Sequence, residues 1–155
     1  MAQVFDTSKP AGAVEATAEG MLSRLVQAIN DHDLDTLVDC FAPDYRHEIP
    51  AHPARGFVGR DGERRIWEQI FQLVPDIHGR VPYHLVDGET VWTEWEMSGT
   101  GRNGDQHREA GVIVFGVADG RATWSRFYLE LVENGGGPGG PAGDSPPHEA
   151  GEGRS

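Results

Sequence analysis

The sequence predicts one α+β domain, in which helices come first and an antiparallel sheet follows. Up to Pro75, apolar residues recur at the three- and four-residue spacing of helices, and beyond it they alternate with polar residues as in strands. The segment 134–155 is dominated by Gly, Pro, Ala and acidic residues and offers no aromatic or branched aliphatic side chain to bury, and 1–14 resembles it. We therefore expect a folded domain over 15–133, a flexible N-terminus and a disordered Gly/Pro-rich tail.

Three helices and one short strand are predicted before Pro75. Residues 15–30 form an amphipathic pattern, and Asp33 is placed to cap a second, shorter helix. Asp61 precedes a third helical pattern, which Pro75 ends. A strand over Tyr45–Ile49 lies between the second and third helices.

Three or four strands are expected after Pro75. The pairs Asp87-Gly88 and Asp119-Gly120 are typical of tight hairpin turns. The predicted strands are 80–87, 90–100, 109–118 and 122–132. Helices followed by an antiparallel meander indicate helices packed on one face of a curved sheet.

Composition excludes several classes of function. A formal net charge of -12 would repel nucleic-acid phosphates, and no basic patch compensates for it. No run reaches the roughly 18 apolar residues of a membrane span, and the first residues do not have the pattern of a secretion signal, so a cytoplasmic location is expected. Cys40 is the single cysteine, and Lys9 is the single lysine and lies outside the folded domain, so thiol-pair and Schiff-base chemistry are not expected.

Four stretches carry a family resemblance. They are Asn30–Asp35, Phe41–Tyr45, Gly59–Gly62 and Asp119–Arg121 leading into Trp124–Glu130. Their order and spacing resemble the SnoaL-like branch of the NTF2-like (nuclear transport factor 2) superfamily, over about 18–133. The resemblance implies a cone-shaped domain with a hydrophobic pocket between sheet and helices, often in a homodimer. Relatives include polyketide cyclases, ketosteroid isomerases, epoxide hydrolases, a dehydratase and non-catalytic transport factors, so the fold does not settle the function.

The working carboxylates of such enzymes stand on inward strand positions, and here those positions are apolar. By motif alignment, the hydrolase-like Arg and Asp fall on Trp95 and Met97, and the Asp of the last strand falls on Phe127. The isomerase-like base falls on Ile49 and its phenol donor on Leu25. Neither set of catalytic groups carries over to this sequence.

Strand alternation separates an inner face from an outer one. Thr93, Trp95 and Met97 share one face of the strand 90–100, while Glu94 and Glu96 share the other. The same reasoning places Ser125 and Phe127 inside. The residues expected to contact a ligand are Trp67, Trp95, Met97, Phe127, Ile49, Thr93 and Ser125.

His47 and Tyr45 are the candidate catalytic residues. His47 shares the inner face of the short strand with Tyr45 and Ile49, and an imidazole titrates near neutrality, as a general base requires. Tyr45 would support it as a hydrogen-bond donor, or pack with its hydroxyl at the rim of the pocket. The alternative for His47 is a hydrogen-bonded histidine without chemistry. No metal site is expected, because Glu48 should point away from His47, and no cofactor is needed.

The outer face of the sheet is predicted to carry Trp92, Trp124 and Tyr128. An exposed aromatic patch of this kind favours a homodimer across the sheet, or else burial under the chain termini. Arg126, on the same face, is expected to pair with Glu94 or Glu96.

Three hypotheses remain open from the sequence. The first is a cofactor-independent cyclase, isomerase or dehydratase that acts on an apolar small organic molecule, with His47 as acid/base. The second is a protein that binds such a molecule without chemistry. The third is a structural dimer whose cone is filled by its own side chains.

Overall fold

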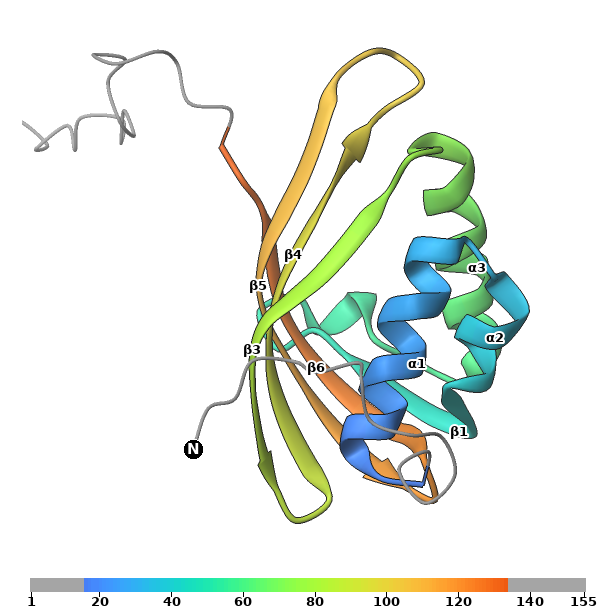
Figure 1. Cartoon of the computed structure of the whole chain (residues 1–155), viewed down its shortest axis with the longest axis vertical. Helices are drawn as coiled ribbons and strands as arrows, with labels where there is room; N and C mark the ends of the chain where they lie inside the picture. The colour runs from blue at the N-terminus through green and yellow to red at the C-terminus, as the bar shows by residue number, and fades with distance from the viewer. Residues whose placement is uncertain (1–15, 134–155) are drawn as a thin grey trace, which may run out of the picture.

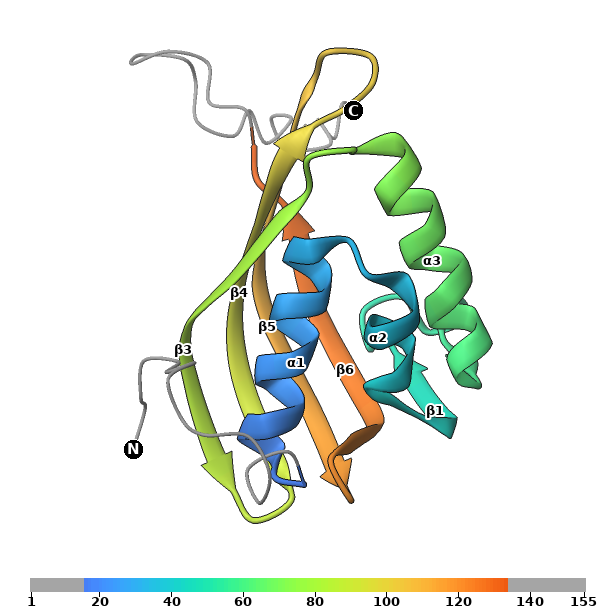
Figure 2. The same ribbon diagram turned by 45° about the vertical axis from the view of Figure 1, so that its right-hand side comes forward.

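The computed structural model describes residues 16–133, in which helices pack on one face of a strongly curved sheet (Figures 1 and 2). The α+β fold predicted from the sequence is confirmed. The elements are α1 (Ala18–Asp31), α2 (Leu34–Asp39), β1 (Phe41–Glu48), the short 3-10 helix η1 (Pro53–Arg55), β2 (Phe57–Val58), α3 (Arg60–Leu73), β3 (His78–Asp87), β4 (Thr90–Thr100), β5 (Gln106–Ala118) and β6 (Arg121–Leu131). The predicted segments 1–14 and 134–155 lie outside the described residues.

The sheet is mixed, which corrects the expectation of a wholly antiparallel one. Its strand order is β2-β1-β6-β5-β4-β3. Strands β3 to β6 form the predicted antiparallel meander, but β1 runs parallel to β6, with His47 opposite Ser125. The strand direction could not be read from the sequence, because β1 lies between helices and no hairpin turn joins it to β6.

Local signals explain where the helices begin. The Thr17 hydroxyl accepts a hydrogen bond from the Gly20 backbone N–H at 3.0 Å and so caps α1. Asp33 caps α2 as predicted, accepting from the Thr36 N–H at 3.2 Å. Helix α3 begins at Arg60 after Gly59, whose φ of 99° places it in a region that favours glycine, and not after Asp61.

The core lies between the inner face of the sheet and the helices α1 and α2. The apolar stripe of α1 (Met21, Leu22, Leu25 and Ile29) is buried against the sheet. Figure 2 shows α1 running along the concave side of the strands, with α3 further out over one end of the sheet. Burial of this stripe on one side of a helix contributes the apolar area that holds the helix layer to the sheet.

The outer face differs from expectation in one ion pair. Arg126 pairs with Glu48 through Nε and Oε2 at 3.1 Å, not with Glu94 or Glu96. Strand β5 stands between β4 and β6, so Arg126 is not adjacent to the β4 carboxylates. Glu96 instead pairs with Arg80 on the neighbouring strand β3, at 2.5 Å.

Candidate functional site

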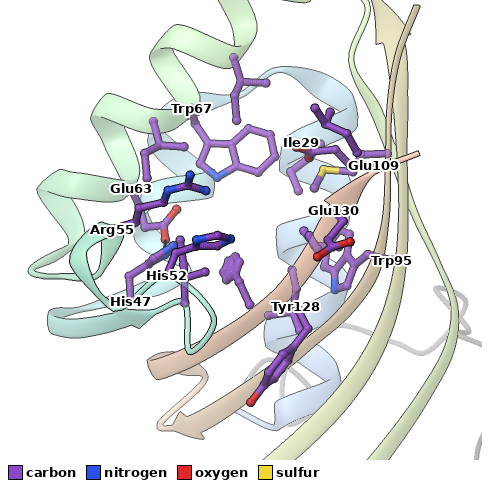
Figure 3. A pocket seen from close by; sticks show the side chains of 18 of the residues that line it. Ile29, His47, His52, Arg55, Glu63, Trp67, Trp95, Glu109, Tyr128 and Glu130 are labelled. Atoms are coloured by element: carbon purple, nitrogen blue, oxygen red, sulfur yellow. Dashed lines mark hydrogen bonds and ion pairs between the residues drawn. The ribbon is translucent and has the colours of Figure 1, made fainter. Parts of the chain in front are cut away.

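A cavity of about 850 Å³ lies between the helices α1 and α3 and the inner face of the sheet. Figure 3 shows Trp67 of α3 and Trp95 of β4 on its walls, with His47 at one side. Ile29, Ile66, Ile70, Met97, Ile113, Phe115 and Phe127 are among the apolar side chains that line it. The size and the mostly apolar wall match those of cavities that hold small organic ligands.

A buried contact between two ionisable side chains lies in this wall. His47 Nδ1 lies 2.6 Å from Glu63 Oε1, with 6% and 1% of the two side chains exposed. His47 projects inward from β1, and Glu63 from the first turn of α3. An ionised carboxylate can only accept a hydrogen bond, so pairing with an ionised Glu63 requires the proton on His47 Nδ1. In that tautomer His47 donates from Nδ1 to Glu63 Oε1.

Two aromatic rings hold the His47 imidazole in place. The Phe57 ring is stacked on it, with centroids 4.5 Å apart and planes 12° from parallel. The Phe127 ring lies against the imidazole at a tilt of 32°, with the two ring centroids 4.2 Å apart. His47 Nε2 has no hydrogen bond to any residue between 16 and 133, and His47 lines the cavity. The ring thus has one nitrogen fixed by Glu63 and the other available to a ligand.

Tyr45 lies behind His47. Its hydroxyl is 3.2 Å from His47 Nδ1 and is hydrogen-bonded to the Ser125 hydroxyl. Burial, and then the negative charge of Glu63, raise the pKa of the Tyr45 phenol well above its usual value. Tyr45 is therefore neutral and does not act as a base, and towards a protonated His47 Nδ1 its hydroxyl oxygen can only accept.

The structure brings most, but not all, of the expected residues to the cavity. His47, Ile49, Trp67, Trp95, Met97 and Phe127 line it. Tyr45, Thr93 and Ser125 do not, although they lie on the inner face and are buried. Alternation fixes the face of a strand but not the depth of a side chain.

Thr93 is a buried residue of the inner face that supports the cavity wall without lining it. Its hydroxyl donates to the Ile113 carbonyl at 2.6 Å and accepts from the Trp95 indole N–H at 2.7 Å. These bonds fix the Trp95 ring, which forms part of the cavity wall. Thr93 thus shapes the site through another residue.

Glu63 is the main residue that sequence reasoning missed. It precedes Ile66 and Trp67 by three and four positions and Ile70 by seven, so it shares their inward helix face. The signal was a charged residue on the apolar face of α3. The expectation that inward carboxylates stand on strands does not include a residue of this helix.

The rim of the cavity holds further polar side chains. His107 and Glu109 project from β5, with Nε2 and Oε2 3.8 Å apart. His52 and Arg55 reach in from the loop that contains η1, and Glu130 lies on the far side with Glu109 (Figure 3). Glu109 is an inward strand carboxylate that the sequence analysis did not identify.

Between 16 and 133, no three His, Cys, Asp or Glu side chains are grouped so that they could hold a metal ion. In the same range, no helix is long and apolar enough to cross a membrane.

A model of the SnoaL-like domain matches residues 22–124. The chain belongs to the SnoaL-like family. No curated protein matches its sequence.

Solved structures share the fold of this SnoaL-like protein at low sequence identity. IdmH of Streptomyces antibioticus, proposed to be a polyketide cyclase, is 22% identical with a TM-score of 0.61, over 72% of this chain and 88% of IdmH. An epoxide hydrolase of M. tuberculosis, described as LEH-like, is 19% identical with a TM-score of 0.63, over 78% and 86% of the two chains. AclR of Streptomyces galilaeus, proposed to be a hydroxylase, is 15% identical with a TM-score of 0.64, over 73% and 78%. At these identities the likeness establishes the fold alone.

Proposed function

We propose that the cavity binds an apolar small organic molecule and that His47 acts on it as a general base, in cofactor-independent cyclase, isomerase or dehydratase chemistry. The observation that carries the proposal is the buried His47–Glu63 contact of 2.6 Å at the cavity wall. A histidine whose one nitrogen is oriented by a carboxylate presents the other as a proton acceptor of defined direction.

The chemistry follows from the protonation of the two nitrogens. With Nδ1–H donated to Glu63, the lone pair of Nε2 removes a proton from a carbon next to a carbonyl group of the ligand. Glu63 then stabilises the imidazolium, and Nε2–H returns the proton to another carbon or to an alkoxide of the rearranged molecule. The proton is conserved over the cycle, so isomerisation or ring closure needs no redox partner.

Tyr45 has a different part in this proposal from the one expected from sequence. Its hydroxyl is buried behind His47 and bonded to Ser125, so it does not touch the ligand. Tyr45 and Ser125 are positioning residues that keep Glu63 and His47 in register. The ligand meets His47, Trp67, Trp95, Met97, Phe127 and Ile49.

Proton abstraction can be tested without knowledge of the natural substrate. The bicyclic ketone 2-tetralone is incubated with the protein in D₂O, and deuterium entry at its α-carbons is followed by NMR. The wild type should exchange faster than buffer, and His47→Ala should lose roughly 10²- to 10⁴-fold of the catalysed rate, the usual effect of removing a general base. His78→Ala is the matched control, because His78 is exposed on β3 outside this cavity.

The result separates the remaining hypotheses. Binding of 2-tetralone, seen as a change in tryptophan fluorescence, without exchange above buffer would indicate a non-catalytic binding protein. Unchanged exchange in His47→Ala would remove His47 from the mechanism. If 2-tetralone neither binds nor exchanges, the result would favour a structural role for the domain.

We also propose a homodimer through the outer sheet face. Trp92 and Tyr128 are 51% and 47% exposed there, and Trp124 is half-buried beside Arg126. Large apolar side chains exposed on a sheet face often mark a protein interface. Trp92→Glu should convert a dimer to a monomer in light scattering, because a charge would be buried in the interface. An unchanged mass would place any interface elsewhere.

A further inference from the structure

The loop between β1 and β2 is an ordered structure at the mouth of the cavity. The backbone N–H of His52 donates to the Ile49 carbonyl at 2.8 Å, and that of Arg55 donates to the His52 carbonyl at 2.9 Å. The Gly56 N–H closes η1 on the Pro53 carbonyl at 3.1 Å. Successive turns of this kind, with proline at the start of η1, restrict the backbone that carries Arg55.

The same loop is fastened to His47. A Cβ on Gly56 would lie 2.9 Å from the His47 carbonyl oxygen, so only glycine allows the loop to approach so closely. The next residue, Phe57, is opposite His47 in the register of β1 and β2, and its ring is stacked on the imidazole. Arg55 is therefore connected through Gly56 and Phe57, which both pack closely against His47, to the proposed base.

Arg55 has no ion pair or hydrogen bond from its side chain to any residue in the described range 16–133. The outer-face arginines differ, since Arg80 pairs with Glu96 and Arg126 with Glu48. Among residues 16–133, Arg55 is the single arginine that lines the cavity, and Figure 3 shows it reaching inward beside His52. An unpaired guanidinium at the mouth of an apolar cavity has its fork of donors available to a ligand.

The charged side chains around the cavity favour one orientation of an anionic ligand. Glu109 and Glu130 lie on the wall opposite Arg55, and Glu63 is already bonded to His47. An anionic group would be repelled from the Glu109 side and attracted to the loop side. The net charge of -12 opposes anions in general, so a preference for them would have to come from a local cation.

We propose that the ligand of this cavity is an apolar molecule bearing one carboxylate group, and that Arg55 binds this carboxylate at the mouth while the apolar body lies against Trp67 and Trp95. The proposal rests on the proposed binding function of the cavity. It adds a substrate class and a residue that determines specificity. Arg55 fixes one end of the ligand, and the loop sets the spacing from that end to His47.

The test compares two bicyclic probes of nearly equal shape, 2-naphthoate and its neutral amide, 2-naphthamide, by isothermal titration calorimetry on the full chain. The wild type should bind 2-naphthoate about tenfold more tightly, and Arg55→Gln should remove about that factor without weakening 2-naphthamide. Arg65→Gln is the control with the same charge change, because Arg65 is exposed on α3 and does not line the cavity. It should change the affinity for 2-naphthoate by less than about twofold.

Two results would overturn the proposal while leaving the binding function intact. One is equal affinity of the wild type for both probes, and the other is an equal loss in Arg55→Gln and Arg65→Gln. Failure of both probes to bind the wild type would overturn the proposed binding function itself, and the carboxylate preference with it.

Discussion

Two histidine–glutamate pairs line the same cavity in contrasting surroundings. His47 and Glu63 lie 2.6 Å apart with 6% and 1% of their side chains exposed. His107 and Glu109 lie 3.8 Å apart with 29% and 30% exposed. The first pair joins a strand to a helix, whereas the second comes from alternate positions of β5.

The difference shows that tertiary surroundings, and not residue type, decide what such a pair does. At His47, two aromatic rings and the Tyr45 hydroxyl restrict the imidazole to one orientation. At His107, water competes for both partners, and the attraction is screened. The buried pair is therefore held in one arrangement, while the rim pair is loose.

The largest expected effect is on stability. His47→Ala leaves the Glu63 carboxylate buried without its donor, which should lower the free energy of unfolding by about 3 kcal/mol. His107→Ala leaves Glu109 in contact with water and should cost less than about 1 kcal/mol. Urea denaturation of the two variants measures the difference.

A double variant tests whether the buried Glu63 charge causes this loss of stability. In His47→Ala with Glu63→Leu no buried charge remains, so part of the lost stability should return. Equal losses in His47→Ala and His107→Ala would show that the two pairs are energetically alike.

A smaller effect should appear in the pH dependence of the Tyr45 network. The pKa of Tyr45 is raised by folding, so the unfolded chain releases this proton first, near pH 10, and stability is lost as the pH rises above that value. Tyr45→Phe should therefore show a shallower fall in melting temperature between about pH 9.5 and 11.

Ionisation of the Cys40 thiol also lowers stability as the pH rises, and it does so in both proteins. Burial raises the pKa of its thiol to about 11, so its contribution is lost between the unfolded value of 9.0 and about 11. It is present in the wild type and in Tyr45→Phe alike and cancels in their difference. Parallel curves for the two proteins would mean that Tyr45 ionises as easily folded as unfolded.

The smallest expected effect concerns the rim pair alone. Glu109→Gln should change the free energy of unfolding by less than about 0.5 kcal/mol at low salt, and raising the salt should remove what difference there is. Thermal unfolding at two ionic strengths is the measurement. A salt-independent loss above about 1 kcal/mol would indicate that Glu109 makes a desolvated contact like that of Glu63.

Much of the fold could be predicted from the sequence because its signals are local. Helical periodicity, the Asp33 cap and the Asp87-Gly88 and Asp119-Gly120 turns act over a few residues. They were sufficient for the order along the chain of the three α-helices, β1 and β3 to β6, and for the inner face of β4. The alternation that placed Trp95 inside is a property of any strand.

The candidate site depended on pairings that no local signal encodes. The parallel alignment of β1 with β6 puts His47 opposite Ser125, 78 positions further along the chain. The packing of α3 on β1 brings Glu63 to His47, and the close approach of Gly56 positions Arg55. The sequence by itself determined which residues face inward, since that follows from the 3.6- and 2-residue periods of the backbone. Only the tertiary structure decided which of them meet, because contacts between distant segments depend on how whole elements pack.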